Sequence, residues 1–77
     1  MSNLSLVEAG ESEIRFLEYR LAVISQWPPS ARKEVSLEAV SRRLAAIARS
    51  TAASAGSHNE MVALSCRLLD EVFAVRS

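Results

Sequence analysis

Two breaks divide the chain into three segments, and within each segment the apolar residues recur at the spacing of an α-helix. The first break is Trp27-Pro28-Pro29, because a proline lacks the N–H of the helical ladder and disfavours helical geometry in the residue before it. The second break is Gly56, which suits the left-handed position that ends many helices. No run alternates apolar and polar residues as a strand does. We therefore expect an all-α fold, a three-helix antiparallel bundle.

Residues 1–77 are expected to form one all-helical domain, since 77 residues support a single small core. Gly10 interrupts the first helical pattern, so residues 1–10 are predicted to be a loose N-terminal segment or a short extra turn. The predicted helices cover about residues 11–26, 29–53 and 58–75.

Local signals predict the helix ends. Pro29 fits the first position of the second helix, where its missing N–H would be unpaired in any case. Ser57 and Glu60 have the spacing of a capping box, which predicts Ser57 as the N-cap of the third helix. Gly56 is expected to have a positive φ angle.

The first helix carries two apolar faces. One is a seam with coiled-coil spacing, made of Ile14, Leu17, Leu21 and Ile24, and we expect it to face the core. The opposite face holds every aromatic residue of the chain except Phe73, together with one valine. Its members are Phe16, Tyr19, Val23 and Trp27. A helix of a small bundle has one inner side, and exposed aromatics are typical interface anchors. The aromatic face is therefore predicted to bind a second copy of the chain or a protein partner, unless the first helix lies between the other two or residues 1–10 fold back over it.

The other two helices differ in the breadth of their apolar surface. The second has one stripe, formed by Leu37, Val40, Leu44, Ile47 and Ala48. The third has two adjacent rows, the first of Met61, Leu64, Leu68, Val72 and Val75 and the second of Val62, Cys66, Leu69 and Phe73. Both rows are assigned to the core, so Cys66 is expected to be a buried, inert thiol.

No constellation typical of catalysis, metal binding or cofactor binding is visible. The single histidine, His58, falls in the first turn of the third helix and is expected to be exposed. One histidine and one cysteine do not supply a metal-ligand set, and the two isolated glycines do not form a phosphate-binding loop. We expect no enzyme activity, no metal and no cofactor.

The charges balance over the chain but not along it. Residues 1–20 hold four acidic and two basic side chains, whereas residues 31–50 hold two acidic and five basic ones. An acidic helix beside a basic one explains this distribution. The alternative is an anion-binding face of a small nucleic-acid-binding regulator, formed by Arg32, Lys33, Arg42, Arg43 and Arg49. No aromatic residue is interleaved with them for base stacking, so we rank this alternative second.

The leading hypothesis is a non-enzymatic protein–protein interaction module that forms a homodimer, because a domain this small without disulfides gains stability by self-association. In size and helical build the chain resembles the small bacterial regulators and secretion co-chaperones that act by gripping another protein. That resemblance covers architecture only, and implies an adaptor, antiactivator or co-chaperone role. Eight of the nine basic residues are arginine, which suggests a GC-rich bacterial genome. The chain shows no signal-peptide pattern and no apolar run of membrane-spanning length, so a cytoplasmic location without membrane association is expected.

Overall fold

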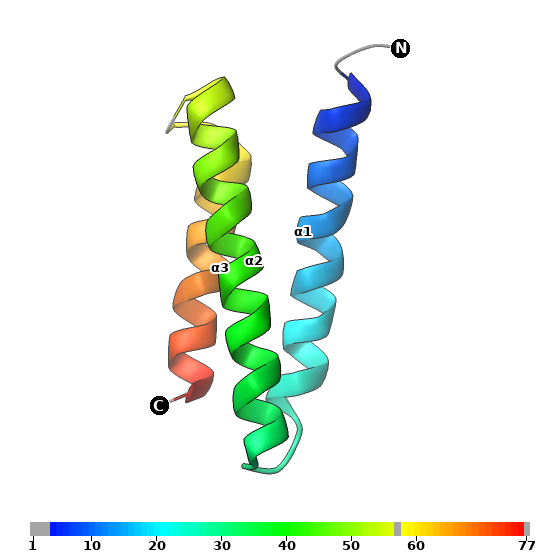
Figure 1. Ribbon diagram of the computed structural model, residues 1–77, viewed down its shortest axis with the longest axis vertical. Helices are drawn as coiled ribbons and strands as arrows, with labels where there is room; N and C mark the ends of the chain where they lie inside the picture. The colour runs from blue at the N-terminus through cyan, green and yellow to red at the C-terminus, as the bar shows by residue number, and fades with distance from the viewer. Residues whose placement is uncertain (1–3, 57, 77) are drawn as a thin grey trace.

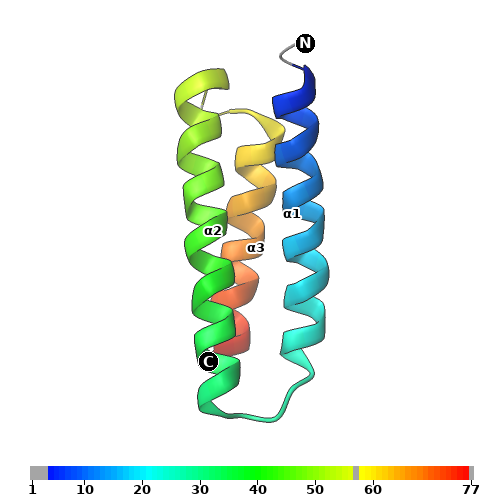
Figure 2. The ribbon, with the colours of Figure 1, turned by 45° about the vertical axis from the view of Figure 1, so that its right-hand side comes forward.

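Three antiparallel helices make up the computed structural model, which describes residues 4–56 and 58–76, with side chains described from residue 10 onward. They are α1 (Leu4–Ser25), α2 (Ala31–Ala55) and α3 (Glu60–Arg76). The described residues contain no strand, so the predicted all-helical, three-helix fold is confirmed. The chain runs down α1, up α2 and down α3, which lies behind α2 (Figure 1). The view rotated about the vertical axis shows α3 between the other two helices, so that the three form a triangular bundle (Figure 2).

α1 begins earlier than predicted. It is helical from Leu4, so the expected loose segment 1–10 is wrong for residues 4–10, while residues 1–3 lie outside the described part. Gly10 lies inside the helix rather than breaking it. A Cβ atom at Gly10 would come within 2.8 Å of the Met61 Cε atom, so the glycine allows α1 to approach the start of α3 closely.

The first helix ends near the first predicted break, but α2 starts later than predicted. α1 ends at Ser25, and Trp27 N–H donates to the Ile24 carbonyl at 3.0 Å in a tightened last turn. Ser30 is the N-cap of α2, and its Oγ accepts from the Lys33 N–H at 3.1 Å. Pro29 therefore precedes the cap instead of occupying the first helical position.

The second break has the predicted positive φ at Gly56, but its ψ of 154° places the residue outside the predicted left-handed helical conformation. Gly56 has a φ of +93°, and its N–H donates to the Ala52 carbonyl at 3.0 Å. α3 begins at Glu60, two residues after the predicted start. Asn59 supplies the cap, because its Oδ1 accepts from the Met61 N–H at 2.8 Å. The predicted cap Ser57 lies outside the described residues.

The core consists of one apolar face from each helix. All four residues of the α1 seam are buried, as predicted, and so are four of the five stripe residues of α2, Ala48 being half-buried. The buried apolar residues are Ile14, Leu17, Leu21, Ile24, Leu37, Val40, Leu44, Ile47, Leu68 and Val72. Ser65 is also fully buried, and its Oγ donates to the Met61 carbonyl at 2.8 Å, which satisfies the hydroxyl within α3.

The second apolar row of α3 does not belong to the core. Cys66 is exposed and Phe73 is 67% exposed, so the prediction that they are buried is wrong; Val62 and Leu69 are half-buried. Successive helical residues are about 100° apart, and in a three-helix bundle only the row of Leu68 and Val72 points inward. The second row lies at the edge of the contact with α2 and beyond it.

One ion pair joins each pair of helices. Arg43 of α2 pairs with Glu13 of α1, Arg76 of α3 lies 3.4 Å from Glu34 of α2, and Arg67 of α3 lies 4.0 Å from Glu18 of α1. α2 and α3 pack against each other more extensively than α1 packs against either. The acidic first helix thus lies beside the basic second helix, as its charge predicted.

Candidate interaction surface

The outer side of α1 carries a row of exposed apolar side chains. Phe16 is 56% exposed, Tyr19 is 67% exposed and Val23 is 39% exposed. With the exposed Ser12 they are spaced by four, three and four residues, the spacing of a coiled-coil seam. We call these four residues the α1 stripe. The core seam of the same helix is buried on the opposite side, so the stripe has no cover within the described chain.

Trp27, the fourth residue predicted for this surface, lies just beyond the helix. It is half-buried and packs against the edge of the core. The guanidinium of Arg32 lies over its ring, 4.7 Å from the ring centroid. Lys33 Nζ donates to the Trp27 carbonyl at 2.9 Å. Contacts with the start of α2 therefore hold Trp27 in the α1–α2 loop, at the end of the α1 stripe.

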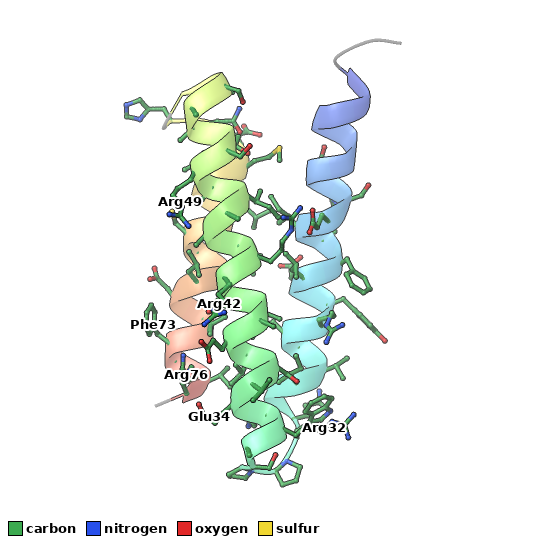
Figure 3. All side chains as sticks on the ribbon, in the orientation of Figure 1. Arg32, Glu34, Arg42, Arg49, Phe73 and Arg76 are labelled. Carbon is green, nitrogen blue, oxygen red and sulfur yellow. The ribbon has the colours of Figure 1, made fainter. Side chains whose placement is uncertain are left out.

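The five basic residues proposed for anion binding do not form one surface. Arg32 and Lys33 hold the α1–α2 loop, as described above. Arg42 pairs with Glu38 at 2.7 Å, whereas Arg49 has no carboxylate partner among the described residues. Arg32 lies at the lower end of the molecule, away from Arg42 and Arg49 on the opposite side (Figure 3).

Arg43 is the most strongly engaged of the five. Its Nε and Nη2 atoms both donate to the Glu13 carboxylate, the second at 2.7 Å. This hydrogen bonding lowers the pKa of the Glu13 carboxyl below its ordinary value and raises the pKa of Arg43, with the attraction between the opposite charges adding to both effects. Arg43 is therefore occupied in holding α1 to α2.

Two further large apolar side chains are exposed outside α1. Val35 of α2 and Phe73 of α3 are each 67% exposed, and Phe73 projects on the far side of the bundle from α1 (Figure 3). Val35 was not predicted as a surface residue, because it lies off the inward stripe of α2. The signal available for it was its isolation from that stripe, which predicts exposure.

No group of side chains suited to acid–base or metal chemistry comes together in the part of the chain that the structure describes. No three His, Cys, Asp or Glu residues gather there at metal-binding distance. His58 and Cys66 are both exposed. Glu34 and Glu38 lie one helical turn apart on α2, but each carboxylate forms an ion pair with an arginine: Glu34 with Arg76 and Glu38 with Arg42.

A surface hollow of about 650 Å³ lies where α1, α2 and the start of α3 meet. Gly10 and Met61 border it and the Glu13–Arg43 pair lies in its wall. The rest of the lining consists of mostly small side chains of α2 together with Asn59: Ala46, Ile47, Ser50, Thr51, Ser54, Ala55 and Asn59. Among the described residues that line the hollow, the only charged ones are Glu13 and Arg43, which are paired with each other. This arrangement has the chemistry of a helix packing groove rather than of a reaction site.

Comparisons with known proteins do not assign the chain to a family: no family model, no curated protein and no solved structure matches it. Within the described residues, none of the helices combines the length and apolar character needed to cross a membrane. Among the large apolar side chains that are exposed in the described residues, most belong to the α1 stripe: Phe16, Tyr19 and Val23, against Val35 and Phe73 on the other two helices.

Proposed function

We propose that the protein is a non-enzymatic helical interaction module that forms a homodimer and binds a protein partner, in the manner of an adaptor, antiactivator or co-chaperone acting in the cytoplasm. The observation that carries the proposal is the α1 stripe, an exposed aromatic row backed by a helix whose other side is committed to the core. Aromatic side chains dominate the energetic centres of protein interfaces.

The total surface supports the presence of a partner. The chain exposes 5460 Å². A typical folded monomer of this mass exposes about 4600 Å², so the excess is roughly 850 Å². A standard protein interface covers about 800 Å² on each partner. The elongated shape, 42 × 23 × 15 Å, accounts for the excess and leaves a long flank available for contact.

Phe16 alone would contribute substantially to such an interface. It is 56% exposed, which for a phenylalanine leaves on the order of 100 Å² to be covered. Covering that area at about 25 cal/mol per Å² stabilises the complex by about 2.5 kcal/mol per copy. Phe16→Ala removes this contribution from both copies, about 5 kcal/mol in all, and should raise the Kd of the dimer by a factor of about 10³ to 10⁴.

The test is the molar mass in solution, measured by light scattering over a range of protein concentrations. Wild type should approach twice 8.4 kDa. Phe16→Glu and Val23→Glu should be monomeric, because a charge would be forced into desolvated surface. Phe73→Glu is the matched control, since Phe73 is exposed to a similar extent on the far side of the bundle, and it should remain dimeric. Circular dichroism checks that each variant is folded.

A wild type that stays monomeric at high micromolar concentration with full cooperative stability would refute the dimer. The nucleic-acid alternative has its own measurement, the binding of labelled duplex DNA at low salt. Because Arg32, Lys33, Arg42 and Arg43 already have partners within the chain, we expect no binding with the steep salt dependence that multiple phosphate contacts produce. Such binding would favour the alternative.

A further inference from the structure

We infer that the second copy packs on the α1 stripe in antiparallel orientation, about a two-fold axis that passes between Phe16 and Tyr19. The inference rests on the proposed function and specifies its interface. In this arrangement Phe16 of each copy contacts Tyr19 of the other, and Ser12 lies opposite Val23. The bulky aromatics then occupy the centre of the interface, and each outer layer pairs a small side chain with a medium one.

The charges beside the stripe are self-complementary in this orientation. Glu13 directly follows Ser12, and Arg20 directly follows Tyr19 seven residues later, so both lie along the same edge of the stripe. The two-fold axis brings Glu13 of one copy within about two residues, or 3 Å of helical rise, of Arg20 of the other. Two symmetric ion pairs can therefore form across the interface.

A parallel arrangement has the opposite charge pattern. In parallel helix pairs, the residue before a seam position faces the residue five further along the other helix, and such flanking charges set the orientation. Here that rule places Arg15 of one copy beside Arg20 of the other, and the repulsion occurs twice. Like charges at these positions disfavour the parallel dimer.

The structure leaves both members of the proposed ion pair in position to meet. Arg20 has no carboxylate partner among the described residues, and its guanidinium lies 5.9 Å from the centroid of the Phe16 ring, at the edge of the stripe. The Glu13 side chain is 33% exposed even though Arg43 holds it. Arg43 fixes the Glu13 carboxylate at the α1 surface and donates to both of its oxygens, and each oxygen retains a second lone pair that can accept from another arginine.

Cysteine cross-linking distinguishes the orientations. The background is Cys66→Ser, into which Ser12→Cys and Val23→Cys are introduced separately. In the antiparallel dimer the two copies of either cysteine are about 16 Å apart along the helix, too far for a disulfide. Each variant alone in a glutathione redox buffer should give no cross-linked dimer, and their equimolar mixture should give one. Cross-linking of each variant alone would show a parallel dimer and overturn the inference.

The mass of the same variants separates this inference from the proposed function. If the variants are dimeric by light scattering and neither they nor their mixture cross-link, the interface lies elsewhere and the antiparallel α1 arrangement is wrong. If they and wild type are monomeric, the proposed homodimer itself fails.

A charge exchange supplies the second test. Arg20→Glu places a glutamate opposite Glu13 and should raise the Kd at least about tenfold at low salt. Arg49→Glu is the control, because Arg49 is an exposed arginine on α2 without a described carboxylate partner, and it should change the Kd less than about twofold. Mixing Arg20→Glu with Glu13→Arg should restore association as a heterodimer, once circular dichroism shows that both variants are folded. Equal Kd values for Arg20→Glu and Arg49→Glu would overturn the proposed ion pair and with it this orientation.

Discussion

The two glycines of the chain should respond differently to alanine, and not as the space around them suggests. At Gly56 a Cβ atom would meet nothing within 4 Å, yet the backbone angles of φ +93° and ψ 154° lie in a region that is almost exclusive to glycine. We expect Gly56→Ala to lower the free energy of unfolding by about 1–3 kcal/mol through backbone strain alone.

At Gly10 a Cβ atom would lie 2.8 Å from Met61 Cε, but the backbone is helical. Alanine is favoured over glycine in a helix by about 1 kcal/mol. The atom it meets is the end of a flexible side chain, and moving Met61 off its rotamer costs about 0.5–1.5 kcal/mol. The two effects offset each other, so Gly10→Ala should remain within about 1 kcal/mol of wild type.

Urea unfolding followed by far-ultraviolet circular dichroism measures both effects, at one fixed protein concentration so that association does not differ between samples. The slope of the free energy against urea should be unchanged in both variants. If Gly56→Ala has the wild-type midpoint, the α2–α3 junction does not have the geometry described. If Gly10→Ala is the more damaging variant, the approach of α1 to Met61 is rigid rather than adaptable.

Three further results are expected. Asn59→Ala should lower the free energy of unfolding by about 0.5–2 kcal/mol, because the Met61 N–H loses its cap, and an unchanged urea midpoint would contradict that role. Cys66 should react with a thiol reagent in the native protein, since its side chain is exposed, and labelling that needs denaturant would show that something covers α3. The pKa of Glu13 is lowered in the folded state, so its contribution to stability is present above about pH 4.3 and is lost as the pH falls through the folded-state pKa. The difference in stability between wild type and Glu13→Gln should therefore shrink in acid; a difference that is constant with pH would exclude the Arg43 hydrogen bond as its cause.

The helix count and the inner faces could be predicted because apolar periodicity records which side of a helix is buried. The spacing of Ile14, Leu17, Leu21 and Ile24 identified the buried side of α1. The helix ends were less predictable, because they depend on contacts distant in the sequence. Gly10 is read locally as a helix breaker, and only the position of Met61 explains why the helix continues through it.

The candidate surface could be predicted only in part. Because α1 has two apolar faces and only one can face the core, Phe16 and Tyr19 were predicted to lie outside the core, and both are exposed. The same reasoning assigned Cys66 and Phe73 to the core, although they too lie outside it. A second apolar row at the edge of an interhelical contact has the same sequence pattern as a buried row. The sequence predicted an acidic helix beside a basic one, but it could not show which residues pair, because partners such as Glu13 and Arg43 lie thirty residues apart.

The contacts between helices make α1 the least extensively packed helix of the bundle. The link of α1 to α3 includes an exposed ion pair, Arg67–Glu18 at 4.0 Å, of a kind that contributes at most about 1 kcal/mol. A second copy on the α1 stripe would therefore stabilise the helix that the monomer holds least firmly.

If unfolding and dissociation are coupled in this way, a tenfold rise in protein concentration should add about 1.4 kcal/mol to the free energy of unfolding of the dimer at a given urea concentration. The urea midpoint of wild type should increase with concentration, and that of Phe16→Glu should not. Amide hydrogen exchange should show the same dependence first in α1, because dissociation exposes that helix to local opening. A midpoint independent of concentration in a wild type that is dimeric throughout the titration would mean that the copies associate without stabilising α1, and the interface would then have to lie on α2 and α3.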